Sequence, residues 1–149
     1  MIATTAQSGE GTMGEIRVEV KLTNAIDEGN ARRRTIAEDE VRRCHATAMV
    51  DTGAVRSILP VQLVEQLGIQ IRGNRVAEYA DGRNEVVGVT EPIIFEIMGR
   101  DTLEEALVLG NEVLIGQTVL EKLDLLADCA NQRLIPNPEH PTQPVCKIR

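Results

Sequence analysis

Apolar and polar residues alternate over much of this chain, which is the pattern of β-strands with one buried face. The clearest case is the segment 16–22, where Ile, Val, Val and Leu alternate with Arg, Glu and Lys. Turn signals follow such stretches at short intervals. The pattern predicts a mainly antiparallel β domain with seven or more short strands. Its predicted strands include 16–22, 41–50, 69–71, 93–98, 103–109, 125–128 and 133–136.

Two short helices are predicted to interrupt these strands. Pro60 fits the first turn of a helix over 61–67, and Gly68 would end it. A second helix is predicted over 117–124. The segment 27–34 contains a Gly and an Asn and is predicted to be a charged loop, with its Arg-Arg-Arg run exposed to solvent. These helices are too short for a parallel α/β architecture.

The turn signals predict several hairpins. Asp81-Gly82 is a dipeptide favoured in two-residue turns, where both central residues need positive φ. It therefore predicts a hairpin over Val76 to Val89, with its tip near Ala80 to Arg83. A turn is also predicted at Gly73-Asn74. Further hairpins are predicted at Gly99-Arg100-Asp101 and at Asn131-Gln132.

The ends of the chain differ from its middle. Residues 1–13 are small and polar and are predicted to be disordered. Residues 14–136 are expected to form one folded domain. Residues 137–149 carry three of the prolines, and with Pro136 they predict an extended tail that cannot be helical.

Composition narrows the possible partners and location. The chain has 16 Lys and Arg against 23 Asp and Glu, a net charge of −7, with one Phe, one Tyr and no Trp. Neither charge nor aromatic content suits nucleic-acid binding. No signal peptide or membrane-spanning run is recognised, and Cys44, Cys129 and Cys146 fit neither a disulfide framework nor a zinc site. We therefore expect a cytoplasmic protein without membrane contact, metal or cofactor.

The richest chemical signal is the segment 49–60, Met-Val-Asp-Thr-Gly-Ala-Val-Arg-Ser-Ile-Leu-Pro. Two apolar stretches flank a tight turn that would hold the Asp51 carboxylate in place without sealing it from solvent. Gly53 would allow a backbone geometry that a residue with Cβ resists. An ordinary hairpin, in which Asp51 and Thr52 only hydrogen-bond the turn, is the alternative.

This segment resembles the active-site segment of the retroviral-type aspartic peptidases, the retropepsin-like members of clan AA. Val113-Leu114-Ile115-Gly116 followed by a helix matches a second signature of that family, and the 76–89 hairpin lies where the family has its flap. The resemblance covers about residues 46–128. It implies a single-lobe acid protease barrel with one or two short helices over 14–136. We expect a bacterial or cellular member, because the C-terminal tail differs from those of the viral enzymes.

The resemblance implies a role for each matching residue. Asp51 would be the catalytic acid, Thr52 would bond across a dimer axis, Gly53 would contact a substrate amide and Ala54 would line the cleft. Tyr79, Ala80, Asp81 and Gly82 would form the flap tip, and Ile115 and Gly116 would pack behind the active-site turn. Because the chain has one Asp-Thr-Gly, a second acid must come from a second copy. The implied activity is hydrolysis of extended polypeptides by a homodimer.

Two positions depart from the retroviral pattern. Val55 stands where that pattern often has an acid, and Gln117 stands where it often has the basic partner of this acid. A non-catalytic peptide- or protein-binding module of the same fold is therefore the main alternative, and a purely structural β domain is a third. A nucleophilic site built from Ser57, His45 and His140 is disfavoured, because no Gly-x-Ser-x-Gly motif surrounds Ser57.

Overall fold

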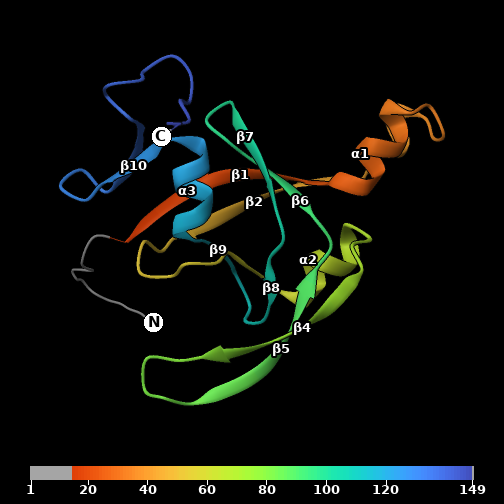
Figure 1. Cartoon of the computed structure of the whole chain (residues 1–149), viewed down its shortest axis with the longest axis horizontal. Helices are drawn as coiled ribbons and strands as arrows, with labels where there is room; N and C mark the ends of the chain where they lie inside the picture. The colour runs from red at the N-terminus through yellow and green to blue at the C-terminus, as the bar shows by residue number, and fades with distance from the viewer. Residues whose placement is uncertain (1–14, 149) are drawn as a thin grey trace.

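The structure is a computed structural model that describes residues 15–148, so the predicted disordered segment 1–13 lies outside the described residues. Nine strands form one strongly curled sheet in the order β4-β5-β8-β3-β9-β2-β1-β6-β7, and β10 and β11 form a separate hairpin (Figure 1). The predicted mainly β architecture is confirmed. The strands are β1 (Ile16–Asn24), β2 (Arg43–Val50), β3 (Ile58–Leu59), β4 (Ile71–Glu78), β5 (Asn84–Thr90), β6 (Ile93–Ile97), β7 (Arg100–Glu104), β8 (Leu107–Val108), β9 (Val113–Ile115), β10 (Leu125–Asp128) and β11 (Arg133–Pro136).

The alternating pattern places one face of these strands in a common core. Within β1, Arg17 and Glu19 are exposed and Lys21 is half-buried, whereas Val20 and Leu22 are buried. Phe95 of β6 is fully buried beside them in the same cluster. Burial of each such side chain stabilises the fold by about 1.5–3 kcal/mol. The core therefore lies inside the curl of the sheet.

Two parallel strand pairs bring distant segments together. β2 pairs in parallel with β9, with Val50 opposite Ile115, and β3 pairs in parallel with β8, with Ile58 opposite Leu107. The other pairings are antiparallel, as predicted. The β2–β9 pair places the end of β2, and so the turn after it, beside Gly116.

The described residues contain three short α-helices and one 3₁₀ helix, more than the one or two predicted. They are α1 (Ala25–Arg32), α2 (Val61–Gln66), α3 (Gln117–Leu123) and η1 (Glu38–Glu40). The two helices predicted at 61–67 and 117–124 are confirmed within a residue at each end. Among residues 15–148, no helix combines the length and hydrophobicity needed to cross a membrane.

The prediction of a loop over 27–34 is wrong, because α1 occupies most of it. The Asn24 side chain caps the helix by accepting hydrogen bonds from the backbone N–H groups of Ile26 and Asp27, both at 3.0 Å. The Asp27 carboxylate is buried and binds the Arg42 guanidinium at 2.8 and 2.9 Å. The cap and the ion pair of the buried Asp27 with the exposed Arg42 thus outweigh the cost of the glycine inside this helix. The arginines at its end are exposed, as predicted.

Two turn predictions differ from the structure. Gly73 and Asn74 belong to β4, where a register shift between Ile71 and Gly73 forms an irregularity in the strand. The turn between β6 and β7 is formed by Met98 and Gly99, with φ values of 55° and 78°. Both central residues have positive φ, which suits the twist of a two-residue hairpin. β7 consequently begins at Arg100, earlier than predicted.

The prediction that the C-terminal segment is not helical is confirmed. The segment does not extend away from the domain, however, but folds back onto it. The buried guanidinium of Arg100 donates hydrogen bonds to the carbonyl oxygens of Leu123, Asp124 and His140 at 3.0, 2.9 and 2.7 Å. The Asp124 carboxylate binds His140 Nδ1 at 2.6 Å and the Val145 N–H at 3.1 Å. These contacts join the tail to the end of α3.

Candidate active site

Asp51 lies in the turn that connects β2 to β3, and backbone hydrogen bonds fix this turn. The Asp51 N–H donates to the Ile115 carbonyl at 2.9 Å, and the Ala54 N–H donates to the Asp51 carbonyl at 3.1 Å. The carboxylate itself accepts a hydrogen bond from the Gly53 N–H at 3.0 Å. Asp51 is half-buried. The turn therefore holds the carboxylate in one orientation and leaves it open to a bound molecule.

Gly53 does not have the backbone geometry that was predicted for it. Its φ lies outside the left-handed region, in contrast to Gly68 and Gly82 with φ values of 64° and 88°. A Cβ at position 53 would lie 3.3 Å from Asp51 Oδ1, tighter than most Cβ contacts. The small residue is therefore explained by its closeness to the carboxylate, because a methyl group would crowd the oxygen that Gly53 itself binds.

Gly116 packs directly against the backbone of the Asp51 turn. A Cβ added there would lie 2.6 Å from both the carbonyl carbon and the oxygen of Arg56, and 2.9 Å from the Val55 oxygen. Side chains essentially never approach backbone this closely. The neighbouring Ile115 is fully buried in the core. Position 116 therefore requires glycine for contact, without a positive φ.

The start of α3 also binds this turn. The Gln117 N–H donates to the Ala54 carbonyl at 2.8 Å, and the Thr118 N–H donates to the Val55 carbonyl at 3.2 Å. The first N–H groups of a helix have no partner within the helix, so the turn satisfies them. The helix and the Asp51 turn thus form one hydrogen-bonded unit.

Thr118 links α3 to the Asp51 turn beside Val55 and Gln117, the two uncharged positions that depart from the retroviral pattern. Its hydroxyl lies 3.0 Å from the Val55 carbonyl oxygen and 2.5 Å from Glu104 Oε2. Glu104 is buried, and its other oxygen binds Lys122 Nζ at 3.0 Å. Sequence reasoning missed this group, because Glu104 and Thr118 come from different elements and no motif joins them.

The hairpin β4–β5 arches over the Asp51 turn (Figure 1). At its tip the Tyr79 N–H donates to the Arg83 carbonyl at 2.8 Å, and the Gly82 N–H donates to the Tyr79 carbonyl at 2.9 Å. The tip lies where it was predicted, but the two-residue turn is wrong: among the tip residues Gly82 has positive φ and Asp81 does not. The loop is the three-residue type, in which one glycine forms a bulge.

Tyr79 packs within the hairpin and is half-buried. Its hydroxyl binds the Glu85 carboxylate, and the Arg83 guanidinium lies 4.5 Å from the centre of its ring. The hydrogen bond to Glu85 raises the pKa of the Tyr79 hydroxyl. These contacts hold the ring against the strands, and its remaining surface faces the space beneath the hairpin.

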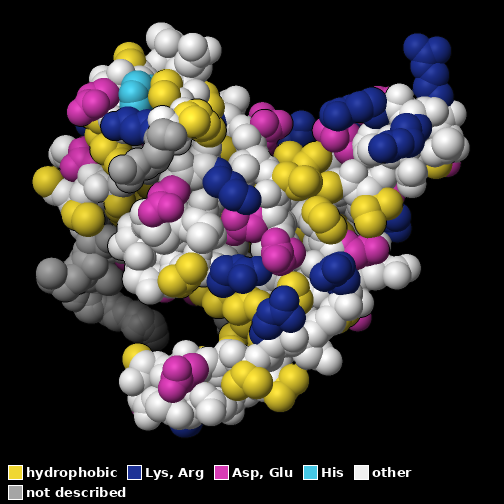
Figure 2. Space-filling model, viewed as in Figure 1, with side chains coloured by type: hydrophobic (Ala, Val, Ile, Leu, Met, Phe, Trp, Pro, Cys, Tyr) yellow, Lys and Arg dark blue, Asp and Glu magenta, His cyan; other side chains and the backbone are white. Residues whose placement is uncertain are grey.

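A groove of about 660 Å³ separates the hairpin from the Asp51 turn. Figure 2 shows the corresponding hollow between the hairpin and the rest of the molecule, with apolar side chains at its edge. Of the predicted site residues, Asp51, Gly53, Ala54, Tyr79 and Ala80 line it. Thr52, Asp81 and Gly82 are exposed and do not line it, and Ile115 and Gly116 lie behind the turn. A second groove of about 520 Å³ shares Tyr79 and Leu109 with the first.

Sequence reasoning missed the apolar walls of the groove. They are formed by the side chains of Val55, Ile58, Val76, Leu107 and Leu109. Val76 is 64% exposed, and an apolar residue at an exposed strand position is a signal that sequence could have provided. The two leucines could not be assigned, because they depend on the pairing of β8 with β3.

The geometry excludes Ser57 as a nucleophile. Ser57 is fully buried, and its hydroxyl oxygen accepts a hydrogen bond from the Gly116 N–H at 2.9 Å. His45 lies on strand β2, within the predicted strand 41–50, and its side chain is exposed; His140 binds Asp124 in the C-terminal segment. No hydrogen bond links Ser57 to either histidine among residues 15–148.

Comparison with known proteins gives fold matches alone. No family model and no curated protein matches the sequence. Among solved structures, the retroviral protease-like domain of Ddi1 from Leishmania major matches with a TM-score of 0.51 and 18% identity, over 83% of this chain and 90% of that domain. EIAV protease in an inhibitor complex (TM-score 0.46, 21% identity, 52% of this chain and 75% of that one) and Simian Foamy Virus (mac) protease (0.45, 15%, 70% and 90%) also match. The match to the Leishmania domain, which extends over most of both chains, shows that this chain has a retropepsin-like fold.

Proposed function

We propose that this chain is an aspartic endopeptidase that acts as a homodimer, with residues 14–136 as its peptidase domain. The observation that carries the proposal is the placement of the Asp51 carboxylate on the floor of a groove beneath a hairpin. A groove of this volume and apolar lining suits an extended polypeptide. The fold match supports a protease-like domain in general, and the catalytic role of Asp51 is our proposal.

The proposed chemistry needs two carboxyl groups. One must be ionised to remove a proton from the attacking water, and the other must be protonated to polarise the carbonyl and to supply a proton to the leaving nitrogen. Two identical carboxyl groups held close together reach this state, because repulsion between like charges keeps one of them protonated. Each protomer supplies one Asp51, so the two protonation steps belong to the pair.

The remaining site residues have supporting roles in this proposal. Thr52, which is exposed, would hydrogen-bond the partner protomer. Gly53 and Ala54 line the groove and would contact the peptide backbone. The hairpin tip from Tyr79 to Gly82 would close over the bound segment and exclude water. The cysteines are free thiols, which fits a reducing compartment such as the cytoplasm.

A peptide-binding module without catalysis is the second candidate. It is favoured by one observation, the absence of an ion pair at Val55 and Gln117. Here the Gln117 and Thr118 N–H groups bind backbone carbonyls instead. The turn is held without exposing a charge to the peptide. Such a module would bind peptides in the same groove with no turnover.

The substitution Asp51→Asn separates the two candidates. The change removes the acid and keeps the shape of the side chain. We expect it to abolish cleavage of a panel of apolar-centred peptides over acid and neutral pH, while circular dichroism and sedimentation show an unchanged fold and dimer. As a matched control, Asp39→Asn alters an exposed carboxylate in η1, outside the groove, and should retain cleavage. Cleavage that survives in Asp51→Asn would refute the mechanism, and binding without turnover in the wild type would establish the second candidate.

A further inference from the structure

A group of arginines lies at one end of the groove. Arg56 lines the groove together with Asp51, and its guanidinium binds Glu105 Oε2 at 3.0 Å. Glu105 in turn lines an adjoining pocket of about 190 Å³ together with Arg72 and Arg75 of β4. The groove and this pocket therefore meet at the Arg56–Glu105 pair. Figure 2 shows basic side chains gathered around acidic ones beside the hollow under the hairpin.

The charge at this end is opposite to that of the whole chain. Arg56, Arg72 and Arg75 carry three positive charges against one negative charge on Glu105, a local surplus of two, whereas the chain carries −7. Hydrogen bonds from its own backbone N–H, followed by the Arg56 and Lys122 charges, lower the pKa of Glu105. Glu105 is thus ionised at neutral pH and balances one arginine.

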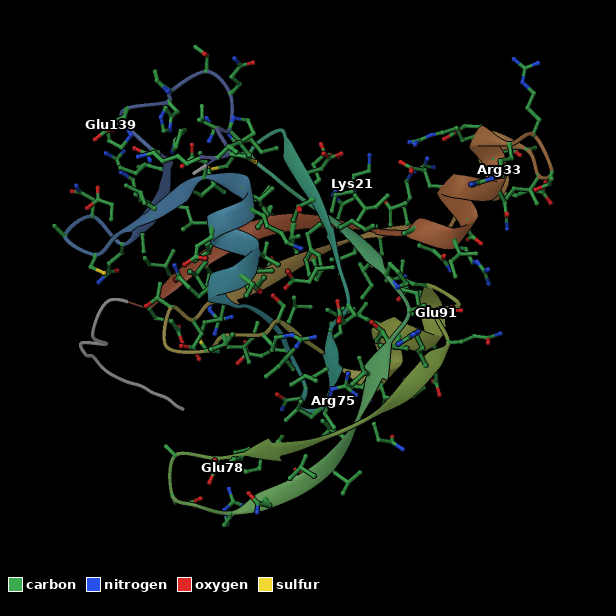
Figure 3. The ribbon with its side chains drawn as sticks, viewed as in Figure 1. Lys21, Arg33, Arg75, Glu78, Glu91 and Glu139 are labelled. Carbon is green, nitrogen blue, oxygen red and sulfur yellow. The ribbon has the colours of Figure 1, made fainter. Side chains whose placement is uncertain are left out.

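Two of the arginines remain available to a ligand. Among residues 15–148, Arg72 and Arg75 form no ion pair with a carboxylate. Both are exposed, and the Arg75 guanidinium forms a single hydrogen bond within the described residues, from Nη1 to the neighbouring Asn74 carbonyl at 2.9 Å. Figure 3 shows Arg75 on the part of the hairpin near β8, with Glu78 farther toward the tip. A bound segment that left the groove past Arg56 would reach the pocket that Arg72 and Arg75 line.

We propose that this end of the groove selects an acidic side chain, Asp or Glu, on the polypeptide that the groove binds. The centre of the groove is walled by apolar residues, so it favours apolar side chains next to Asp51. Beyond Arg56 the lining becomes cationic, and a carboxylate there gains two charge-assisted hydrogen-bond donors. The inference rests on the proposed function in one respect, that an extended polypeptide occupies the groove.

The test compares cleavage of matched peptides by the full chain. The peptides share one apolar centre, carry acetylated and amidated ends, and differ by Glu, Gln or Lys at a single position that is moved outward from the cleaved bond. At one distance we expect kcat/KM for Glu to exceed that for Gln by about five-fold, the range that exposed charge pairs provide. The Lys peptide should be poorer still. The preference should vanish at about 1 M salt, where the screening length falls to about 3 Å.

Charge reversal assigns the preference to these residues. In the double variant Arg72→Glu/Arg75→Glu, the order should invert so that the Lys peptide is cleaved faster than the Glu peptide. The matched control Arg34→Glu/Arg133→Glu makes the same change in net charge at exposed positions outside both pockets, and it should keep the Glu preference. Circular dichroism checks that both double variants are folded.

The outcomes separate this inference from the proposed function. Cleavage of all peptides at equal rates would overturn the acidic preference and leave the peptidase proposal intact. Inversion in the control variant as well would show an effect of net charge alone and would also overturn it. If no peptide is cleaved, the peptidase proposal fails, and binding of the same peptides, measured by fluorescence polarisation, decides between an acidic preference and none.

Discussion

Replacement of Gly116 by alanine perturbs the contact between α3 and the Asp51 turn. The new Cβ would lie 2.6 Å from the carbonyl carbon and oxygen of Arg56. Nonbonded carbon atoms are stable at about 3.5–4.0 Å, so the overlap is about 1 Å. The clashing atoms are backbone, and the hydrogen bonds of Gln117 and Thr118 to the turn prevent the helix from moving away. We expect Gly116→Ala to lower the free energy of unfolding by about 2–3 kcal/mol, the upper part of the range for overpacked sites.

Urea unfolding followed by circular dichroism measures this loss. Gly73→Ala is the matched control, because position 73 has no positive φ and an added Cβ meets nothing within 4 Å. It should change the free energy of unfolding by less than about 1 kcal/mol. Because the turn carries Asp51, peptide binding or cleavage should also fall in Gly116→Ala. Equal stability of Gly116→Ala and the wild type would refute the packing argument.

Two further substitutions test the supports of the fold and of the turn. Arg42 hydrogen bonds lower the pKa of Asp27 below its ordinary value of 3.8, so this pair stabilises the protein above that pH and is lost as pH falls through the lower, folded value. Asp27→Asn should lower the free energy of unfolding by about 2 kcal/mol at neutral pH. When urea unfolding is measured at several pH values, this difference from the wild type should shrink below pH 3.8. A difference that stays constant with pH would contradict the role of the Asp27 charge. Thr118→Val removes the hydroxyl that reaches Val55 and Glu104 and should lower the free energy of unfolding by about 1–2 kcal/mol in the same assay. Thr118→Ser keeps the hydroxyl and should lose less; a stability of Thr118→Val equal to that of the wild type would contradict the role of the hydroxyl.

The parts of the fold that follow local patterns could be predicted from the sequence. The strand alternation in β1, the glycine-containing turn after β2 and the hairpin tip near Asp81 each depend on a few neighbouring residues. So does α3, which begins directly after Gly116. In each case one local choice of side chain determines the backbone, and the structure has the element within a residue or two of the prediction.

The parts that depend on distant partners could not be predicted. Helix α1 contains a glycine. It is stabilised by the Asn24 cap and by the contact of Asp27 with Arg42, which lies 15 residues farther along the chain. The folding back of the tail depends on Arg100, which lies 40 residues before His140. The walls of the groove depend on the parallel pairing of β3 with β8. The burial of Asp27 and Arg100 could not be predicted, because charged residues are ordinarily exposed.

The proposed mechanism requires that two chains share one site in which both Asp51 carboxyl groups act together. A statine-type transition-state mimic measures this directly, because it binds the pair of acids and not one of them. In isothermal titration calorimetry of the full chain, we expect about one inhibitor bound per two chains and no binding to Asp51→Asn. A stoichiometry of one inhibitor per chain, or unchanged binding to the Asn variant, would contradict the shared site.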